Sequence, residues 1–321
     1  MKTTHAFASA RDNIKLDAIE LADAMAVHNR VTEHLKRLGL IVGAFLQGSL
    51  ARKTMISPLR DIDKVVLLVI DYRSRPNGAQ EAAHVIADAL QGMFPHLTPE
   101  IGKHCVKLDF GEHTYSFDIV PAIDLGDDVD ILDITSNRWK RSNTRELIRV
   151  VQQRNTDCGG QFIHQARLIK QFGRHQLNGE VPGLHLESFA YAVILLELED
   201  DEALAAALAE GARALAPGST YYDPTGKDEL SHRLDVRVRH AAHAKFVVAA
   251  QSAAEAVRNR VAGNHNAAIA IWHDLLGEPF PKPDPGKALS ALSLGSGVTT
   301  AGVVSPAAAI RPTPTRSWRP M

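Results

Sequence analysis

The stretch that decides the fold is Leu59-Arg60-Asp61-Ile62-Asp63-Lys64-Val65-Val66-Leu67-Leu68-Val69-Ile70. Its apolar run over residues 62–70 is rich in β-branched side chains and predicts a buried strand. Two carboxylates open that strand. Because successive side chains of a strand point to opposite faces, Asp61 and Asp63 share one face and Lys64 points to the other.

A second predicted strand carries a third carboxylate. Residues 104–110 and 114–120 predict two strands joined by a hairpin turn, and Asp118 lies in the second of them, between Phe117 and Ile119. A buried carboxylate without a partner is costly. Either a metal ion or an arginine partner would remove that cost, so both interpretations of Asp118 stay open at this point.

A glycine and a serine precede the first carboxylates. Gln47-Gly48-Ser49 ends the apolar run 40–46, which predicts another strand, and a helix is expected to begin at about residue 50. Glycine lets the backbone approach a phosphate closely. The serine hydroxyl and backbone N–H groups at a helix start can hold a triphosphate. Gly-Ser pairs also occur in ordinary turns, so the pair gains meaning only from the aspartates that follow.

The three carboxylates fit a two-metal site. Two Mg²⁺ ions about 3.5–4 Å apart can activate a hydroxyl and neutralise a leaving pyrophosphate. Mg²⁺ prefers carboxylate oxygens. We therefore predict that Asp61, Asp63 and Asp118 are both catalytic residues and metal ligands in a phosphoryl-transfer enzyme, with two Mg²⁺ ions as cofactors and Mn²⁺ as an alternative.

The pattern of the chain changes near residue 140. Helical periodicity is also found at 14–38 and 79–94 in the first half, but beyond residue 140 the strand signals fade. The later predicted helices are 144–154, 160–176, 186–198, 201–215, 228–260 and 264–276. We predict an α+β protein: a catalytic lobe with a mixed sheet at 1–140, a helical lobe at 141–277, and a flexible Pro/Gly/Ser/Ala-rich tail at 278–321.

Composition restricts the class of protein. Of 321 residues, 45% are hydrophobic and 23% charged, which predicts a globular chain. The formal net charge of −1 provides no general attraction for nucleic acid or an anionic membrane. Two cysteines without a disulfide or metal pattern suit a reducing cytoplasm. We expect no signal peptide and no membrane association.

These motifs resemble those of the DNA polymerase β-like nucleotidyltransferase superfamily, and most closely the bacterial cyclic-oligonucleotide synthases (CD-NTases), which are similar to cyclic GMP-AMP synthase and oligoadenylate synthetase. The resemblance rests on Gln47-Gly48-Ser49-Leu50-Ala51-Arg52-Lys53-Thr54, on Asp61-Ile62-Asp63, and on Asp118-Ile119-Val120-Pro121-Ala122. Softer matches are Ala166-Arg167-Leu168-Ile169-Lys170 and Glu187-Ser188-Phe189. The similarity covers roughly residues 20–277.

The resemblance implies a polymerase β-like catalytic lobe, a helical lobe that closes the nucleotide cleft, and a site built from the residues above. Gln47, Gly48, Ser49, Lys170 and Ser188 would bind nucleotide, and Asp118 would orient the acceptor hydroxyl. The implied reaction joins nucleoside triphosphates into a cyclic di- or trinucleotide in antiphage (CBASS) defence. The implied partners are an activating protein or a ligase system, with no requirement for nucleic acid.

Two other functions remain open from the sequence. The same chemistry could serve an RNA end, a protein or a small molecule as acceptor. A basic run at 138–154 is consistent with phosphate or nucleic acid contact, or simply with a solvated helix face. A nucleotide-binding module without turnover is the third hypothesis, although such modules often lack one of the acidic residues that are all present here.

Overall fold

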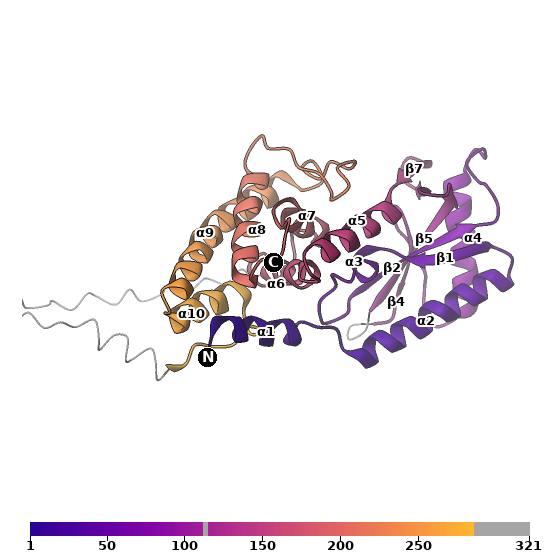
Figure 1. Cartoon of the computed structure of the whole chain (residues 1–321). Helices are drawn as coiled ribbons and strands as arrows, with labels where there is room; N and C mark the ends of the chain where they lie inside the picture. Colours follow the sequence, from indigo (N-terminus) through magenta and orange to yellow (C-terminus); the bar gives the residue numbers. More distant parts are fainter. Residues whose placement is uncertain (112–114, 286–321) are drawn as a thin grey trace, which may run out of the picture. The chain divides into compact units, whose positions relative to one another are not determined.

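The predicted strands form one mixed sheet. The computed structural model describes residues 1–111 and 115–285. Within these residues, seven strands join in a single sheet (Figure 1). They are β1 (Ile41–Leu46), β2 (Asp61–Leu68), β3 (Glu100–Ile101), β4 (Val106–Asp109), β5 (Ser116–Asp124), β6 (Val129–Asp133) and β7 (Arg138–Ser142).

The centre of the sheet is a parallel pair. The strand order is β1-β2-β5-β4-β3, and β6 joins β5 to β7. The strands β2 and β5 run parallel, with Asp61 opposite Ser116 and Asp63 opposite Asp118. All other pairings are antiparallel. The α+β class with a mixed sheet is therefore confirmed.

Two helices cover one face of the sheet and leave the aspartates on the other. The helices α2 (Ala18–Arg37) and α4 (Gly78–Met93) pack on Ile62, Val66 and Leu68 of β2 in one hydrophobic core. Side chains alternate along a strand. Asp61 and Asp63 therefore point away from α2 and α4.

Lys64 points toward α2, as the alternation predicts. Its side chain is fully buried, and its Nζ donates to the backbone oxygen of His28 at 2.6 Å and to the Thr32 hydroxyl. A buried ammonium needs such acceptors. Lys64 thus holds β2, the strand that carries Asp61 and Asp63, against α2.

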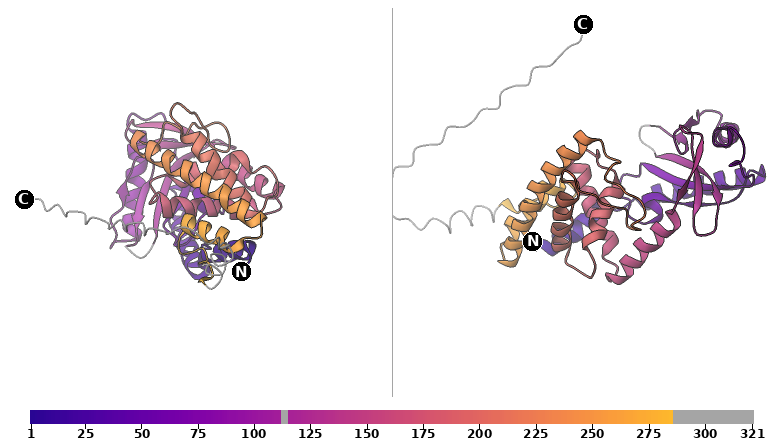
Figure 2. Two further views of the ribbon diagram at one scale, coloured as in Figure 1. Left: turned by 90° about the vertical axis from the view of Figure 1, so that its left-hand side faces the viewer. Right: turned by 90° about the horizontal axis from the view of Figure 1, so that it is seen from above.

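The second half of the described chain is helical. Its elements are α5 (Thr144–Asp157), α6 (Phe162–Gln176), α7 (Gly183–Val193), α8 (Asp200–Leu215), α9 (Val236–Val261) and α10 (His265–Leu276). In Figures 1 and 2, α8, α9 and α10 lie on the side of α6 and α7 that faces away from the sheet. None of the helices in the described residues is long and apolar enough to span a membrane.

The first helix packs with the second half of the chain. The helix α1 (Thr3–Asn13) contacts α6, α8 and α10, and its Phe7 ring meets Trp272 edge to face at 5.3 Å. The predicted limits placed residues 1–140 together in the catalytic lobe. Instead, the apolar side of this short helix completes the helical core.

The predicted tail begins later than residue 278. Phe280 is buried and packs edge to face on Phe7, and the Asp284 backbone N–H donates to Asn266. Met1–Asp284 form one compact unit. From residue 286 onward, the predicted flexible tail lies outside the described residues, as does Glu112 of the turn predicted at Gly111-Glu112.

Gly211 allows α8 and α9 to approach closely, which yields a prediction about stability. A Cβ at Gly211 would lie 2.3 Å from Cε1 of Phe246, a fully buried ring that packs on Phe172 and Phe189. We expect Gly211→Ala to lower the free energy of unfolding by about 1–3 kcal/mol. Gly92→Ala is the matched control, because nothing lies within 4 Å of its new Cβ. That variant should gain about 0.5–1 kcal/mol through helix propensity. Chemical denaturation of both variants measures this, and equal effects would contradict the packing argument.

Candidate functional site

The parallel pair β2–β5 brings two of the predicted carboxylates together. Asp63 and Asp118 are direct register partners, so both side chains leave the same face of the sheet at the same level. Asp61 lies two residues earlier on that face, and its Oδ1 accepts a hydrogen bond from the Ser116 hydroxyl at 2.8 Å. The structure thus gathers the three aspartates on the sheet face left open by α2 and α4.

The surroundings disfavour the ionised aspartates. Burial and the neighbouring Asp118 raise the pKa of Asp63 to about 6. Burial also raises the pKa of Asp118. The Oδ1 atom of Asp118 is buried without a hydrogen-bond partner in the described residues. Each of these effects is relieved by a cation placed between the two carboxylates.

The side chains as they stand do not form a finished metal cage. Within residues 1–111 and 115–285, no three His, Cys, Asp or Glu side chains are arranged as ligands around one point. Asp61 is instead turned toward Ser116. The donor set still fits a hard divalent cation, because it offers carboxylate oxygens on one face and one buried oxygen without a partner. The three-aspartate metal site therefore stays a prediction.

Gly48 lies against the Asp63 carboxylate. The short helix α3 (Gly48–Ala51) follows Gln47, whose backbone N–H donates to the Asp63 backbone oxygen at 2.9 Å. Gly48 has a φ of +67°, and a Cβ there would lie 1.8 Å from Asp63 Oδ2. Only glycine satisfies both conditions. The turn that contains half-buried Ser49 is thereby held beside the metal-ligand candidates.

Lys170 and Ser188, the two candidates from the helical half, have different environments. Lys170 Nζ lies 3.1 Å from Glu187 Oε1, and its charge lowers the pKa of Asp63 against the larger effect of burial. Ser188 is buried, and its hydroxyl donates to the Leu184 backbone oxygen within α7. The Lys170 charge thus acts on Asp63, whereas the Ser188 hydroxyl donates its hydrogen bond within its own helix. The assignment of both residues to nucleotide binding stays a prediction.

No role was predicted for Arg52, Thr54 or Glu187, although all three lie within the sequence motifs that carry the resemblance. Arg52 Nε lies 2.8 Å from Glu187 Oε2, and both side chains are buried. The Thr54 hydroxyl donates to Glu187 Oε1 at 2.7 Å. The available signal was a single acidic residue in the apolar run 184–194. Arg52 and Thr54 lie more than 130 positions earlier in the chain than Glu187, so spacing could not reveal these two partners.

Other contacts hold the segment after α3 against the helices. Arg167 Nε of α6 donates to the Lys53 backbone oxygen at 2.9 Å, and Gln152 Nε2 of α5 donates to the Arg52 backbone oxygen at 3.3 Å. Arg174 of α6 donates to the Ser57 backbone oxygen. The site therefore lies where the open face of the sheet meets α5, α6 and α7.

Several arginines of the basic run at 138–154 form ion pairs or hydrogen bonds within the protein. Arg141 Nε pairs with Asp130 at 2.8 Å, and Arg145 pairs with Asp124 at 2.7 Å while stacking on the Phe45 ring. Arg154 donates to two backbone oxygens near the end of α7. These contacts neutralise or engage much of the positive charge that the sequence offers to phosphates.

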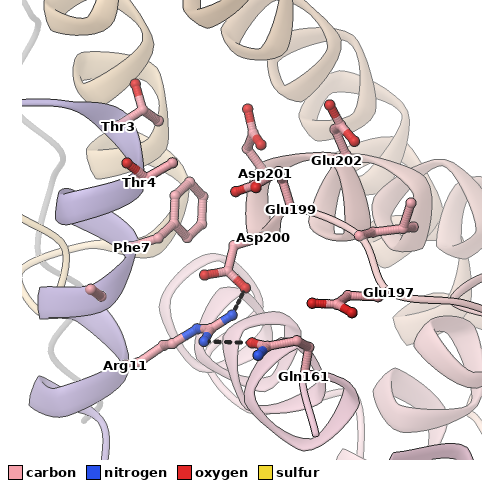
Figure 3. A pocket seen from close by; sticks show the side chains of 12 residues that line it. Thr3, Thr4, Phe7, Arg11, Gln161, Glu197, Glu199, Asp200, Asp201 and Glu202 are labelled. Carbon is pink, nitrogen blue, oxygen red and sulfur yellow. Dashed lines mark hydrogen bonds and ion pairs between the residues drawn. The ribbon is translucent and has the colours of Figure 1, made fainter. Parts of the chain in front are cut away.

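A pocket in the helical half lies apart from this site. It is formed by α1 and the start of α8, and Arg11 there pairs with Asp200 and Gln161 (Figure 3). Its other charged side chains are acidic: Glu197, Glu199, Asp201 and Glu202. Such a lining repels phosphates, so the pocket is not a triphosphate site.

Comparison with known proteins identifies a domain in the first half of the chain. Residues 1–155 match the family model described as the Second Messenger Oligonucleotide or Dinucleotide Synthetase domain. No curated protein matches the sequence of the chain.

Solved structures share the fold at low sequence identity. Escherichia coli CdnC with ATP is 16% identical with a TM-score of 0.66, over 88% of this chain and 99% of that chain. The Bradyrhizobium diazoefficiens CD-NTase CdnG in complex with GTP is 15% identical with a TM-score of 0.66, over 84% and 96%. The Vibrio cholerae di-nucleotide cyclase DncV is 13% identical with a TM-score of 0.61, over 88% of each chain.

The domain match covers the strands that carry all three aspartates, and the structural matches extend over the helical half. The chain is therefore a nucleotidyltransferase whose residues 1–155 match a second-messenger oligonucleotide or dinucleotide synthetase domain and whose fold is shared with bacterial CD-NTases.

Proposed function

We propose that this chain joins ribonucleoside triphosphates into a cyclic di- or trinucleotide and releases pyrophosphate. The observation that carries the proposal is the register of Asp63 opposite Asp118 on parallel strands, with Gly48 packed on the Asp63 carboxylate. The charge of Lys170, on α6, also acts on the Asp63 carboxylate. The turn proposed to bind phosphate therefore lies with the carboxylate pair and within the electrostatic influence of a basic side chain, which supports the proposal.

The residues divide into two roles. Asp61, Asp63 and Asp118 would hold two Mg²⁺ ions, or Mn²⁺, which supply charge neutralisation and activation of the acceptor hydroxyl. Asp118, whose pKa is raised by burial, would orient that hydroxyl and accept its proton. The Gly48 and Ser49 amides and the Lys170 ammonium would hold the triphosphate so that the leaving pyrophosphate stays in line.

The setting is also part of the proposal. The synthetase domain and the fold shared with CD-NTases suggest a second messenger made in the cytoplasm during antiphage (CBASS) defence. Escherichia coli CdnC, a protein of similar fold, has been solved in complex with a HORMA protein. We propose by analogy that a partner protein activates this chain, and that its substrates include ATP or GTP, as the nucleotides bound to CdnC and CdnG suggest.

The decisive assay uses all four labelled ribonucleoside triphosphates with Mg²⁺ or Mn²⁺. Products are treated with phosphatase and analysed by mass spectrometry. A phosphatase-resistant oligonucleotide supports the proposal and identifies its bases. Label that ends on RNA, protein or a small molecule in a cell lysate, with no cyclic product, favours the alternative acceptors and overturns the proposed product.

Replacing Asp63 should separate activity from stability. We expect Asp63→Asn to lower the rate of product formation on the order of 10³-fold, because a metal ligand is lost. Its melting temperature without metal should rise, because the variant removes a half-buried charge that Asp118 repels. Asp71→Asn, an exposed position just beyond the end of β2, should keep full activity. Near-normal activity of Asp63→Asn would refute the site.

A methyl group on Gly48 should also slow turnover. Gly48→Ala places a Cβ against Asp63 Oδ2, and we expect a loss of about 100-fold in rate from the displaced carboxylate. Gly39→Ala is a matched control, because Gly39 has the same φ of +67° but nothing within 4 Å of a Cβ. Both variants carry the same backbone strain, so equal activities would show that the clash with Asp63 is irrelevant.

A further inference from the structure

One buried carboxylate joins two cations that come from different parts of the fold. Glu187 lies on α7 and is 1% exposed. Arg52 comes from the turn after α3, and Lys170 comes from α6. The aspartates, the Gly48-Ser49 turn and Lys170 are proposed to bind metal or phosphate. Glu187 carries a negative charge beside Arg52 and Lys170, next to the proposed triphosphate site. Its presence there requires an explanation, because by itself it would repel the substrate.

The hydrogen bonds of Glu187 are unevenly shared. Its Oε2 accepts from Arg52 Nε at 2.8 Å. Its Oε1 accepts from Thr54 Oγ1 at 2.7 Å, from Lys170 Nζ at 3.1 Å and from Arg52 Nη2 at 3.2 Å. Burial would raise the pKa of Glu187, but Arg52 and Lys170 lower it to about 2. Glu187 is therefore ionised at neutral pH.

Arg52, Lys170 and Glu187 together carry a net charge of +1. Arg52 and Lys170 carry two cations, and Glu187 is the one carboxylate that forms an ion pair with either of them in the described residues. Both cations also act on Asp63. The arrangement therefore keeps two buried cations in place with one counter-charge, and it leaves a net positive charge beside the Asp63 carboxylate.

Gly183 leaves room for the Lys170 side chain, which lies beside Glu187. A Cβ at Gly183 would lie 2.8 Å from Lys170 Cε and 3.1 Å from its Nζ. The φ of Gly183 lies outside the left-handed region, so its backbone does not demand glycine. The missing side chain at the start of α7 therefore serves to admit the lysine.

The segment that Arg52 anchors is under local strain. Lys53, the next residue, has a φ of +62°, which is uncommon for a residue with a side chain. Its backbone oxygen is held by Arg167, and the backbone oxygen of Arg52 is held by Gln152. Such a conformation persists only where its surroundings fix it. The Arg52–Glu187 pair is part of that fixation, three residues after Ser49.

We propose that Glu187 is a positioning residue for the triphosphate: it fixes Arg52, and through it the turn after Gly48-Ser49, and it holds Lys170 at the cleft until a phosphate takes the ammonium over. This inference rests on the proposed nucleotide site. Three donors share Oε1, so Lys170 can turn to phosphate while Arg52 and Thr54 keep Glu187 in place.

Glu187→Gln distinguishes positioning from simple charge. The variant removes a negative charge next to the phosphates, so attraction alone would make ATP and GTP bind more tightly. Positioning demands the opposite. We expect the Kd of a non-hydrolysable ATP or GTP analogue with Mg²⁺, measured by calorimetry, to rise about tenfold or more. The KM should rise more than kcat falls. Unchanged or tighter binding would overturn the proposal.

Further variants keep the test valid if Glu187→Gln does not fold. Glu187→Asp keeps the charge but shortens the reach, and Arg52→Lys keeps the charge but loses the two-bond contact. Both should fold, as judged by circular dichroism and thermal unfolding, and both should bind the analogue more weakly. Wild-type affinity in both would overturn the proposal. Glu146→Gln is the matched control, since Glu146 pairs with Lys227 away from the site and its loss should leave binding unchanged.

The binding measurement separates this inference from the proposed function. If the wild type binds the analogue and the Glu187 and Arg52 variants weaken that binding, the inference holds even when no cyclic product forms. If the wild type makes a cyclic product and the variants keep its Kd and KM, the function holds and the inference fails.

Discussion

Two carboxylates face each other across adjacent parallel strands, and their mutual repulsion organises what surrounds them. Asp63 and Asp118 are register partners on β2 and β5, so neither can move away without breaking the centre of the sheet. Burial and the like charge raise the pKa of Asp63 to about 6. A fold that keeps such a pair must supply positive charge nearby or hold the carboxylates protonated.

The helical half supplies part of that charge without closing the site. Lys170 from α6 and Arg52 from the turn after α3 both lower the pKa of Asp63, and both are held by Glu187. An arginine bound directly to Asp118 would neutralise it permanently and exclude a metal. Instead, Arg52 and Lys170 pair with Glu187, which is separate from the aspartates. Neither cation therefore forms an ion pair with Asp63 or Asp118 in the described residues, which is what the proposed binding of a metal ion by these aspartates requires.

The elements nearest to this pair were the most predictable from sequence. The run 62–70 and the Asp-x-Asp spacing gave β2 and its open face, and Lys64 fulfils the expected alternation by binding α2. The strands β6 and β7 were missed. They are short, and their charged residues Asp130 and Arg141 pair across the two strands, so the sequence there lacks an apolar alternation.

Contacts between segments that lie far apart in the chain could not be predicted from sequence patterns. The packing of α1 on the helical half depends on a few residues such as Phe7 that meet partners near the end of the described chain. The bond between Arg52 and Glu187 joins positions 135 residues apart. Neither contact produces a periodic pattern in the sequence. The Gly-Ser motif was visible in the sequence, but the reason that Gly48 must be glycine became clear only when Asp63 was found against it.

The local charge explains why a metal suits this place better than another basic residue. Three aspartates and Glu187 carry four negative charges when ionised, and Arg52 and Lys170 carry two positive ones. One divalent cation balances that difference, and a second would offset part of the charge of a triphosphate. With no cation bound, burial and the repulsion by Asp118 raise the pKa of Asp63. At the proposed site, nucleotide and metal would therefore depend on each other: a metal would remove the repulsion among the carboxylates, and the triphosphate would bring the negative charge that a second metal requires.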